Sequence, residues 1–421
     1  MSLANVDYQH GFSPPVMLGL SEISYAIQSL YEKRWRMYTA ERQRAQPYLD
    51  QATGPLIEQW YLLHHRMVRV VTNHRKLAVE VRHFLYYAEL LTEYTYHNAS
   101  DLPIAIPEDL LWQVGERLYR PVALTCYLFQ TQPGEAFPPA PAQSKPEHVE
   151  WIEITGVDGP LRARWKEGQL RFREYQPYPG VSSRISSVLH KTDLYATIYI
   201  DDVERCAPWF VMRFVFYMVI GAMLGYDGYE IVHAAAVAQD DTGILIVGSP
   251  ASGKSTLVLS CLQTGMNHLA DDVLFLARDN GLVRVYAFPE DIGVRKGATR
   301  LLGRYEFMQT LAQDQRQKSA VDVQQYFRGR VISSCPVRLM VFLDAKNRCE
   351  EFRAELLPPA QAVSWLMREY ISHQQAKDGE ADYMFDIFGD LATQAPSYQL
   401  WLTPDMEVNV QQVRTLLMKH S

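Results

Sequence analysis

Residues 248–256 read Gly-Ser-Pro-Ala-Ser-Gly-Lys-Ser-Thr and fill every fixed position of the phosphate-loop pattern GxxxxGK[ST]. Directly before them, residues 243–247 include four consecutive apolar residues, which is typical of a short buried strand. Directly after them, residues 257–262 have a composition compatible with a helix. A strand, a glycine-containing loop and a helix are the context that this motif requires. We therefore predict a phosphate-binding turn at this position, and an α/β fold around it.

The motif predicts a site for the phosphates of ATP. Backbone N–H groups of such a loop point inward and cradle the β-phosphate, and the start of the following helix adds partial positive charge. Lys254 is expected to reach the β- and γ-phosphates, and the Ser255 hydroxyl to bind Mg²⁺. ATP and Mg²⁺ are thus the predicted cofactors. The predicted nucleotide cradle consists of Gly248, Ser249, Pro250, Ala251, Ser252, Gly253, Lys254, Ser255 and Thr256.

Length and charge limit the classes of protein to which this chain can belong. With 421 residues it is too long for one ordinary core, so two or three domains are expected. The apolar fraction of 48% is typical of a globular protein, and the formal net charge of −7 gives no reason to expect a nucleic-acid partner. The five cysteines form no CxxC pair, so they indicate neither a disulfide framework nor a zinc site.

No segment of the sequence predicts secretion or membrane insertion. Residues 1–20 lack a charged start followed by an apolar core, so no secretory signal is expected. The most apolar stretch, residues 208–225, is interrupted by Arg213 and is too short to span a membrane comfortably. We predict a buried helix there, no membrane partner and a cytoplasmic location.

The N-terminal part of the chain is predicted to be helical. Apolar and aromatic residues recur there at steps of three or four, and Pro and Gly are rare. Examples of this spacing are Leu56, Trp60, Leu63, Met67 and Val71, and a further helix is expected over residues 108–129. We therefore expect an all-α domain over residues 1–131, which would recognise a target or mediate assembly into a homo-oligomer or complex. Five prolines among small and polar residues then predict a semi-rigid linker over residues 132–147.

Beyond the linker the pattern changes to that of strands. A small β-rich module followed by an apolar helix is expected over residues 148–226, and the phosphate-loop domain over residues 227–421. The strands predicted in the module are 149–155, 161–165, 169–173 and 194–200. The phosphate-loop domain should add strands at 229–238, 273–276, 282–288 and 337–343 and a helix at 359–371.

Two adjacent carboxylates follow the predicted loop and helix. Asp271 lies 17 residues after Lys254 (271 − 254 = 17), a distance that returns the chain to the loop in a strand–loop–helix–strand unit. Phosphoryl transfer to a hydroxyl needs a phosphate cradle, Mg²⁺ and a carboxylate near the attacking oxygen. Asp271 is therefore predicted to accept the hydroxyl proton, and Asp272 to support the metal or to orient Asp271. Taken alone, adjacent aspartates are common in solvated turns, and it is the loop upstream that favours the functional interpretation.

The segment around the loop resembles a known family. His-Ala-Ala-Ala-Val at residues 233–237, the phosphate loop, Gly265 and Ala-Asp-Asp at residues 270–272 resemble HPr kinase/phosphorylase and its HPr-kinase-related paralogues. In that family a histidine lies on the strand before the loop, and a double aspartate ends the segment after the loop's helix. The resemblance covers about residues 230–369. It implies the mixed-sheet nucleotide-binding core of the HPr kinase and PEP carboxykinase type, here combined with the all-α N-terminal domain and the β-rich module.

The resemblance implies that His233 lies near the transferred phosphate. Arg295, which follows a predicted strand, is a candidate for stabilising charge in the transition state, and Glu290 or Asp291 for the second metal carboxylate. The predicted catalytic residues are Asp271, His233, Lys254 and Arg295. The predicted metal ligands are Ser255, Asp272 and Glu290.

These features predict an ATP-dependent kinase that acts on a hydroxyl, with serine of a protein or peptide as the expected acceptor. Members that act on HPr usually carry Gly after the histidine and end the loop in Ser-Glu, whereas this chain has Ala234 and Ser-Thr. It is therefore more similar to the paralogues, some of which phosphorylate serine hydroxyls on other targets. A P-loop ATPase or nucleotide switch remains an alternative, with Asp344 at the end of an apolar strand as its metal ligand. A non-catalytic nucleotide-binding scaffold is the third.

Overall fold

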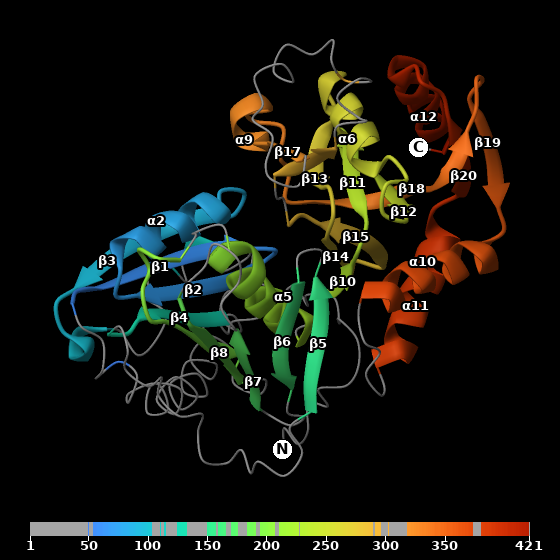
Figure 1. The fold of residues 1–421 in the computed structure, drawn as a ribbon. Coiled ribbons are helices and arrows are strands. Elements are labelled where there is room, and N and C mark those ends of the chain that lie inside the picture. The colour runs from blue at the N-terminus through green and yellow to red at the C-terminus, as the bar shows by residue number, and fades with distance from the viewer. Residues whose placement is uncertain are drawn as a thin grey trace, which may run out of the picture. The chain divides into compact units, whose positions relative to one another are not determined.

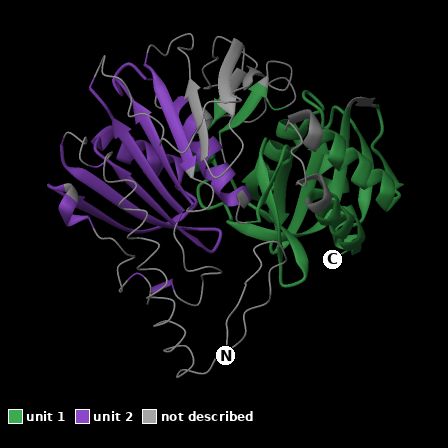
Figure 2. Ribbon diagram, turned by 90° about the horizontal axis from the view of Figure 1, so that it is seen from below, with its two compact units in different colours: residues 1–15, 228–421 green, residues 16–227 purple. Residues whose placement is uncertain are grey.

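The computed structural model describes most of the chain from residue 54 onward. The described residues are 49, 54–102, 110, 113–114, 124–132, 150–156, 159–165, 170–175, 183–190, 194–206, 210–226, 228–288, 291–295, 302, 318–373 and 380–420. The chain divides into two compact units (Figure 2). Unit 1 comprises residues 1–15 and Gly228–Ser421, and unit 2 comprises Val16–Asp227.

Unit 1 is built on a nine-stranded sheet in which seven strands follow the order β10-β14-β15-β18-β12-β11-β13, while β20 pairs with both β18 and β19. Three of its strands are parallel, because β12 and β20 both run parallel to β18. The pairs β11–β12, β14–β15 and β15–β18 are antiparallel, so the sheet is mixed, as predicted. The strands are β10 (Glu230–Val232), β11 (Ala235–Gln239), β12 (Thr242–Gly248), β13 (Asn267–Ala270), β14 (Leu274–Asp279), β15 (Leu282–Tyr286), β18 (Ser334–Arg348), β19 (Arg353–Leu357) and β20 (Ser397–Leu402).

Helices cover both faces of this sheet (Figure 1). On one face, α6 (Lys254–Gln263) and α12 (Met406–His420) share a core with alternate residues of the central strands, among them Ile244, Ile246 and Val341. On the other face lie α10 (Pro359–His373) and α11 (Glu380–Gln394), where Trp365 packs edge-on against Phe342. Val341 and Phe342 point to opposite faces because side chains alternate along a strand. Burial on both faces explains why the central strands read as continuous apolar runs.

A small hairpin accompanies the sheet of unit 1. Strand β16 (Ile292–Arg295) pairs antiparallel with β17 (Lys318–Val321), and the short helix α9 (Val323–Tyr326) follows it. Buried Ile292 and Val294 join the same core as α6. The hairpin therefore packs on the face of the sheet that carries the phosphate loop's helix.

Unit 2 contains a seven-stranded sheet with the order β3-β1-β2-β4-β9-β8-β7. Its strands are β1 (Leu56–Leu63), β2 (Arg66–Thr72), β3 (Glu89–Tyr96), β4 (Leu124–Gln130), β7 (Leu170–Tyr175), β8 (Ile185–His190) and β9 (Tyr195–Ile200). A separate hairpin joins β5 (Glu150–Gly156) to β6 (Gly159–Trp165). The helical segments of unit 2 whose bounds the structure describes are α2 (Arg75–Phe84), the single-turn η1 (Ala99–Asp101), the π-helical η3 (Val211–Phe216) and α5 (Tyr217–Tyr226). Figure 1 shows α2 and α5 against this sheet, α2 beside β1 and β2, and α5 beside β4 and β8.

The prediction of an all-α N-terminal domain is wrong for the part of residues 1–131 that the structure describes. The series from Leu56 to Val71 forms the antiparallel hairpin β1–β2, and residues 124–130, expected to lie in a helix, form β4. Strand β4 pairs with β9, so the expected N-terminal domain and β-rich module share one sheet. The physical reason is burial on both faces of β1 and β2, which removes the alternation by which a strand is recognised. Residues 1–48, which the same prediction covers, lie outside the described residues.

The β1–β2 hairpin of unit 2 contains a buried ion pair. Glu58 on β1 and Arg69 on β2 are both buried, with Arg69 Nε 2.7 Å from Glu58 Oε1. The Tyr96 hydroxyl donates to the second oxygen of Glu58, and the Arg69 guanidinium lies over the Trp60 ring. These contacts compensate two charges removed from water, and the polar residues on a buried strand further obscure its pattern.

Most other predicted elements are confirmed by the structure. The four strands expected in the β-rich module correspond to β5, β6, β7 and β9, although β8 was not predicted. The expected strand 229–238 is interrupted at His233, which separates β10 from β11. The apolar stretch 208–225 forms η3 and α5, and among the described residues no helix is long and apolar enough to cross a membrane.

Candidate functional site

The phosphate-loop motif folds as its sequence predicts, with β12 leading through residues 249–253 into α6. Gly253 has φ of +107°, which favours glycine, and Ala251 adopts φ of +69°. Gly248 has no room for a side chain, because a Cβ there would lie 2.5 Å from the Leu343 carbonyl oxygen. The loop is thus pressed against the neighbouring parallel strand β18, and its tip at Pro250 and Ala251 is exposed.

The start of α6 presents backbone donors to the loop. The Leu257 N–H bonds to the Gly253 carbonyl at 2.9 Å, so the helical ladder begins there. Within an α-helix the N–H groups of the first turn have no acceptor in the helix itself. At α6 these belong to Lys254, Ser255 and Thr256, and together with the helix dipole they favour an anion.

Two side chains at the start of α6 have defined partners. Lys254 is buried, and its Nζ donates to the Gly248 carbonyl at 2.5 Å, so its side chain folds back over the loop. The Ser255 Oγ donates to Asp271 Oδ2 at 2.9 Å. Asp271 follows the end of β13 and is itself buried. The chain therefore returns to the phosphate loop at the residue predicted from the spacing.

The second aspartate has a different partner. Half of the Asp272 side chain is exposed (51%), and its Oδ1 lies 2.9 Å from His233 Nε2. His233 sits between β10 and β11, and only 10% of its side chain is exposed. Its other ring nitrogen, Nδ1, lies 3.8 Å from Oε2 of Glu369, a buried residue on α10. His233 thus lies between two carboxylates that come from different parts of the chain.

Electrostatics connect these side chains to the loop lysine. Burial lowers the pKa of Lys254, because it disfavours the charged ammonium. Asp272, Asp271 and Glu369 act in the opposite direction and stabilise the charged form. All three carboxylates therefore lie within electrostatic range of Lys254, and they offset part of the cost of burying its charge.

The contacts described above do not include four further residues that the sequence suggested, namely Arg295, Glu290, Asp291 and Asp344. The backbone of Arg295 ends β16, but its side chain lies outside the described part of the chain, as does Glu290. Asp291 is described and is exposed, immediately before β16. Asp344 follows Leu343, the register partner of Gly248, and is half-buried. Asp344 therefore lies on β18, the strand next to the phosphate loop, one residue beyond the position that pairs with Gly248.

The residues present fit a magnesium-bound nucleotide. The donor set is all oxygen, the Ser255 hydroxyl with the Asp271 carboxylate, which is the chemistry that Mg²⁺ prefers. Among the described residues no group of three His, Cys, Asp or Glu side chains forms a metal site by itself. Magnesium commonly takes one or two carboxylates together with phosphate oxygens and water, so this pair suffices when a nucleotide is bound.

Glu369 is a site residue that sequence reasoning missed. On α10 the buried positions Ala362, Leu366 and Glu369 follow one another at steps of four and three, which places them on one face. A carboxylate on an otherwise apolar stripe is a signal that the sequence already contains. The predicted helix 359–371 includes it, but nothing local to the phosphate-loop motif points to it.

Comparisons with known sequences and with solved structures give different results. No protein-family model and no curated protein sequence matches this chain. Among solved structures, the HPr(Ser) kinase/phosphatase of Coxiella burnetii is similar over 45% of this chain and 93% of that chain, with 16% sequence identity and a TM-score of 0.26. At a TM-score of this size the match supports no assignment of activity.

Proposed function

We propose that this protein is an ATP- and Mg²⁺-dependent kinase that transfers a phosphoryl group to a hydroxyl, with serine of a protein or peptide as the acceptor. The observation that carries the proposal is the hydrogen bond from Ser255 to Asp271 beside the buried Lys254. It joins the loop motif to a carboxylate 16 positions further along the chain, beside the helix start where a nucleotide's phosphates and metal would bind.

In this proposal the phosphate loop and Lys254 hold the phosphates, and Ser255 with Asp271 holds the metal. Bound ATP with Mg²⁺ supplies the phosphoryl group and neutralises phosphate charge. Lys254 must exchange the Gly248 carbonyl for a phosphate oxygen, which is a stronger acceptor because it is charged. The partly buried setting of Lys254 strengthens that contact, since the effective dielectric constant is lower there than in water.

The geometry supports a change in the roles of the two aspartates. From the sequence, Asp271 is expected to accept the hydroxyl proton, yet it is buried and bonded to the candidate metal ligand Ser255. Asp272 is half exposed and can be reached by an acceptor from solvent. We therefore propose Asp272 as the carboxylate that accepts the proton, with His233 holding it in place, and Asp271 as the metal ligand.

Transfer of ³²P from γ-labelled ATP to candidate proteins and peptides tests this proposal. Asp272→Asn should retain nucleotide binding and lose transfer by at least 100-fold, as expected for removal of a general base. Asp271→Asn should instead weaken Mg²⁺-dependent nucleotide binding, measured by calorimetry with and without Mg²⁺. Full transfer by Asp272→Asn would assign the base elsewhere, and unchanged Mg²⁺ dependence in Asp271→Asn would refute the metal role.

A P-loop ATPase without phosphotransfer is the second candidate function. It is favoured by Asp344, which ends the apolar run of β18 directly beside the loop strand β12. In that case Asp344→Ala should abolish nucleotide hydrolysis while Asp272→Asn leaves it unchanged. The kinase proposal expects the opposite result for phosphoryl transfer: Asp272→Asn should lose it and Asp344→Ala should retain it. The same pair of variants therefore separates the two functions.

We propose unit 2 as the part of the chain that recognises the acceptor or assembles copies of the protein, in place of the expected helical domain. Its seven-stranded sheet is a fold of its own, with its own aromatic core that includes Tyr127, Phe129 and Tyr199. Light scattering coupled to size exclusion, with and without an acceptor identified by the transfer assay, measures both properties on the full chain.

A further inference from the structure

We infer that Glu369 is a positioning residue for the His233–Asp272 pair. The inference deepens the proposed function, on which its catalytic consequence rests. Glu369 comes from α10, far along the chain from the phosphate loop, and it is 5% exposed. A buried carboxylate is costly unless compensating charges or hydrogen bonds surround it. Its described surroundings include the His233 ring at 3.8 Å and the electrostatic influence of Lys254.

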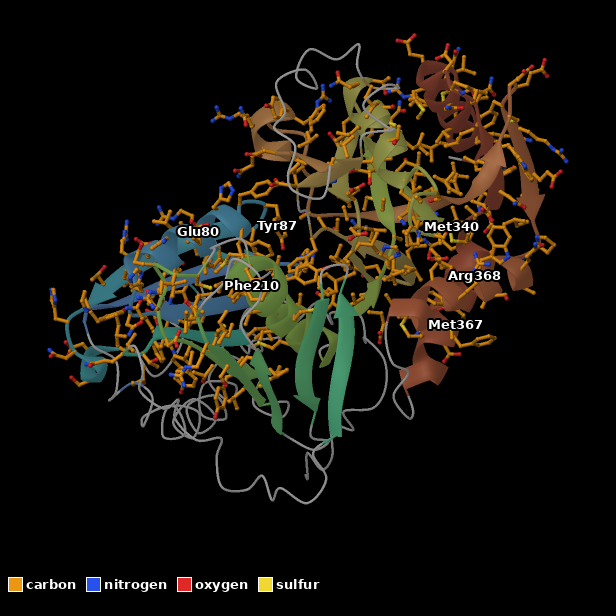
Figure 3. The ribbon with its side chains drawn as sticks, viewed as in Figure 1. Glu80, Tyr87, Phe210, Met340, Met367 and Arg368 are labelled. Atoms are coloured by element: carbon orange, nitrogen blue, oxygen red, sulfur yellow. The ribbon has the colours of Figure 1, made fainter. Side chains whose placement is uncertain are left out.

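The exposed neighbour Arg368 does not provide equivalent compensation. Arg368 is labelled in Figure 3, and its Nη2 lies 3.6 Å from Glu369 Oε1. Its side chain is 63% exposed and its guanidinium also lies over the Trp365 ring. Ion pairs to such an exposed side chain are screened by water and contribute little. Lys254 and the His233 ring, which are largely buried, are therefore the groups whose interaction with Glu369 is least screened by water.

The arrangement fixes the proton on the histidine. Asp272 accepts at its Oδ1, and an ionised carboxylate can only accept, so His233 Nε2 must carry the proton in this contact. Nδ1 lies 3.8 Å from the second carboxylate, that of Glu369, which is beyond hydrogen-bond distance, so this contact is electrostatic. It attracts the ring when both ring nitrogens carry a proton, and it then favours the ring orientation in which Nε2 points to Asp272. Glu369 thereby sets the direction in which His233 holds the exposed Asp272.

Glu369, His233 and Asp272 form a triad. In it Asp272 is the proposed base, His233 holds Asp272, and Glu369 orients His233. Each member comes from a different element: α10, the junction of β10 and β11, and the end of β13. Within the site, Glu369 contacts His233 and also acts electrostatically on Lys254. Its removal should therefore alter turnover more than nucleotide binding.

Nuclear magnetic resonance of the histidine ring nitrogens tests this inference without any substrate. Full-length protein carrying ¹⁵N-histidine is compared with Glu369→Gln, Glu369→Ala and Arg368→Ala, and His233→Gln assigns the His233 signals. Both Glu369 variants should shift the His233 ring nitrogens, whereas Arg368→Ala should not. Glu369→Gln preserves side-chain size, so it keeps the test valid where Glu369→Ala fails to fold. Unchanged His233 signals in Glu369→Gln would overturn the inference, whatever the protein's activity.

A double-mutant cycle measures the catalytic consequence. Glu369→Gln should lower kcat for transfer by roughly 10- to 100-fold, the range known for groups that orient a site residue, with the KM for ATP within about twofold. In a His233→Gln background the same change should have no further effect, because both substitutions remove one coupled unit. Independent, multiplying effects on kcat would overturn the inference. A chain that transfers no phosphoryl group at all would refute the proposed function, and the resonance comparison would still decide the role of Glu369.

Discussion

His268 should make the stability of unit 1 depend on pH. It lies on β13, fully buried, in register with Val237 of β11 and on the same face as the core beneath α6. Among the described residues neither of its ring nitrogens has a hydrogen-bond partner. Burial alone lowers the pKa of His268 from 6.5 to about 3. The ring is therefore neutral in the folded protein at every pH at which the protein would normally be studied.

The sign and size of the effect follow from the two pKa values. Between pH 6.5 and about 3 the unfolded chain binds a proton at His268 that the folded chain does not, so stability falls as the pH falls. One pKa unit corresponds to about 1.4 kcal/mol, which gives roughly 2 kcal/mol lost between pH 6.5 and 5 and about 5 kcal/mol over the whole window. Above pH 6.5 this contribution is fully present and constant.

Replacing His268 by Leu should remove this dependence. Urea unfolding at pH 7.5 and pH 5.0, followed by hydrogen exchange of peptides from β11 and β13, reports the free energy of unfolding of unit 1 separately from that of unit 2. The loss of stability between the two pH values should be about 2 kcal/mol smaller in His268→Leu than in the wild type. The exposed His83, replaced by Gln, is the control and should change neither value. Equal losses in the wild type and His268→Leu would refute the reasoning.

Three further predictions concern other parts of the molecule. Gly248→Ala should destabilise unit 1 by about 1–3 kcal/mol in a denaturant titration, because its Cβ would meet a backbone oxygen of β18 at 2.5 Å. The control is Gly389→Ala on α11, which has open space around it and should be neutral or slightly stabilising in the same titration. Glu58→Ala should cost unit 2 about 3–5 kcal/mol, since it leaves the Arg69 charge buried without its partner, and restored stability in the double variant with Arg69→Leu would show that the unpaired charge is the cause. Lys254→Met should abolish nucleotide binding, measured by calorimetry, without lowering the melting temperature of the ligand-free protein by more than a few degrees.

The sequence predicts the part of the site that one short segment encodes. The fixed glycines and the lysine of the phosphate loop determine the local backbone, so the strand, the loop, α6 and the return to Asp271 follow from spacing alone. The spacing does not predict which side chain each of the two aspartates contacts. Asp271 and Asp272 lie in the bend after β13, where no regular periodicity directs their side chains, and only the structure places Asp271 at Ser255 and Asp272 at His233.

The errors of sequence reasoning arise where burial is complete. Leu56 to Val71 has no polar face, because β1 and β2 are covered on both sides, and its apolar residues then fit a helical spacing by chance. The turn between these strands gave no signal either, since His64 and His65 occupy positions with positive φ where Asn-Gly is the usual choice. Glu369 was missed for a different reason, because only the packing of α10 against the sheet brings it to His233.

The side chains that surround Lys254 and His233 carry a negative balance of charge, which favours a bound cation. Asp271, Asp272 and Glu369 bring three carboxylates to Lys254 and His233. In ordinary ionisation states these five side chains sum to −2 with a neutral imidazole and to −1 with a charged one. Two of the carboxylates, Asp271 and Glu369, are buried, and a buried charge needs compensating charges or hydrogen bonds around it. A divalent cation held by Ser255 and Asp271 would offset part of this negative charge, in agreement with the proposed Mg²⁺-dependent function.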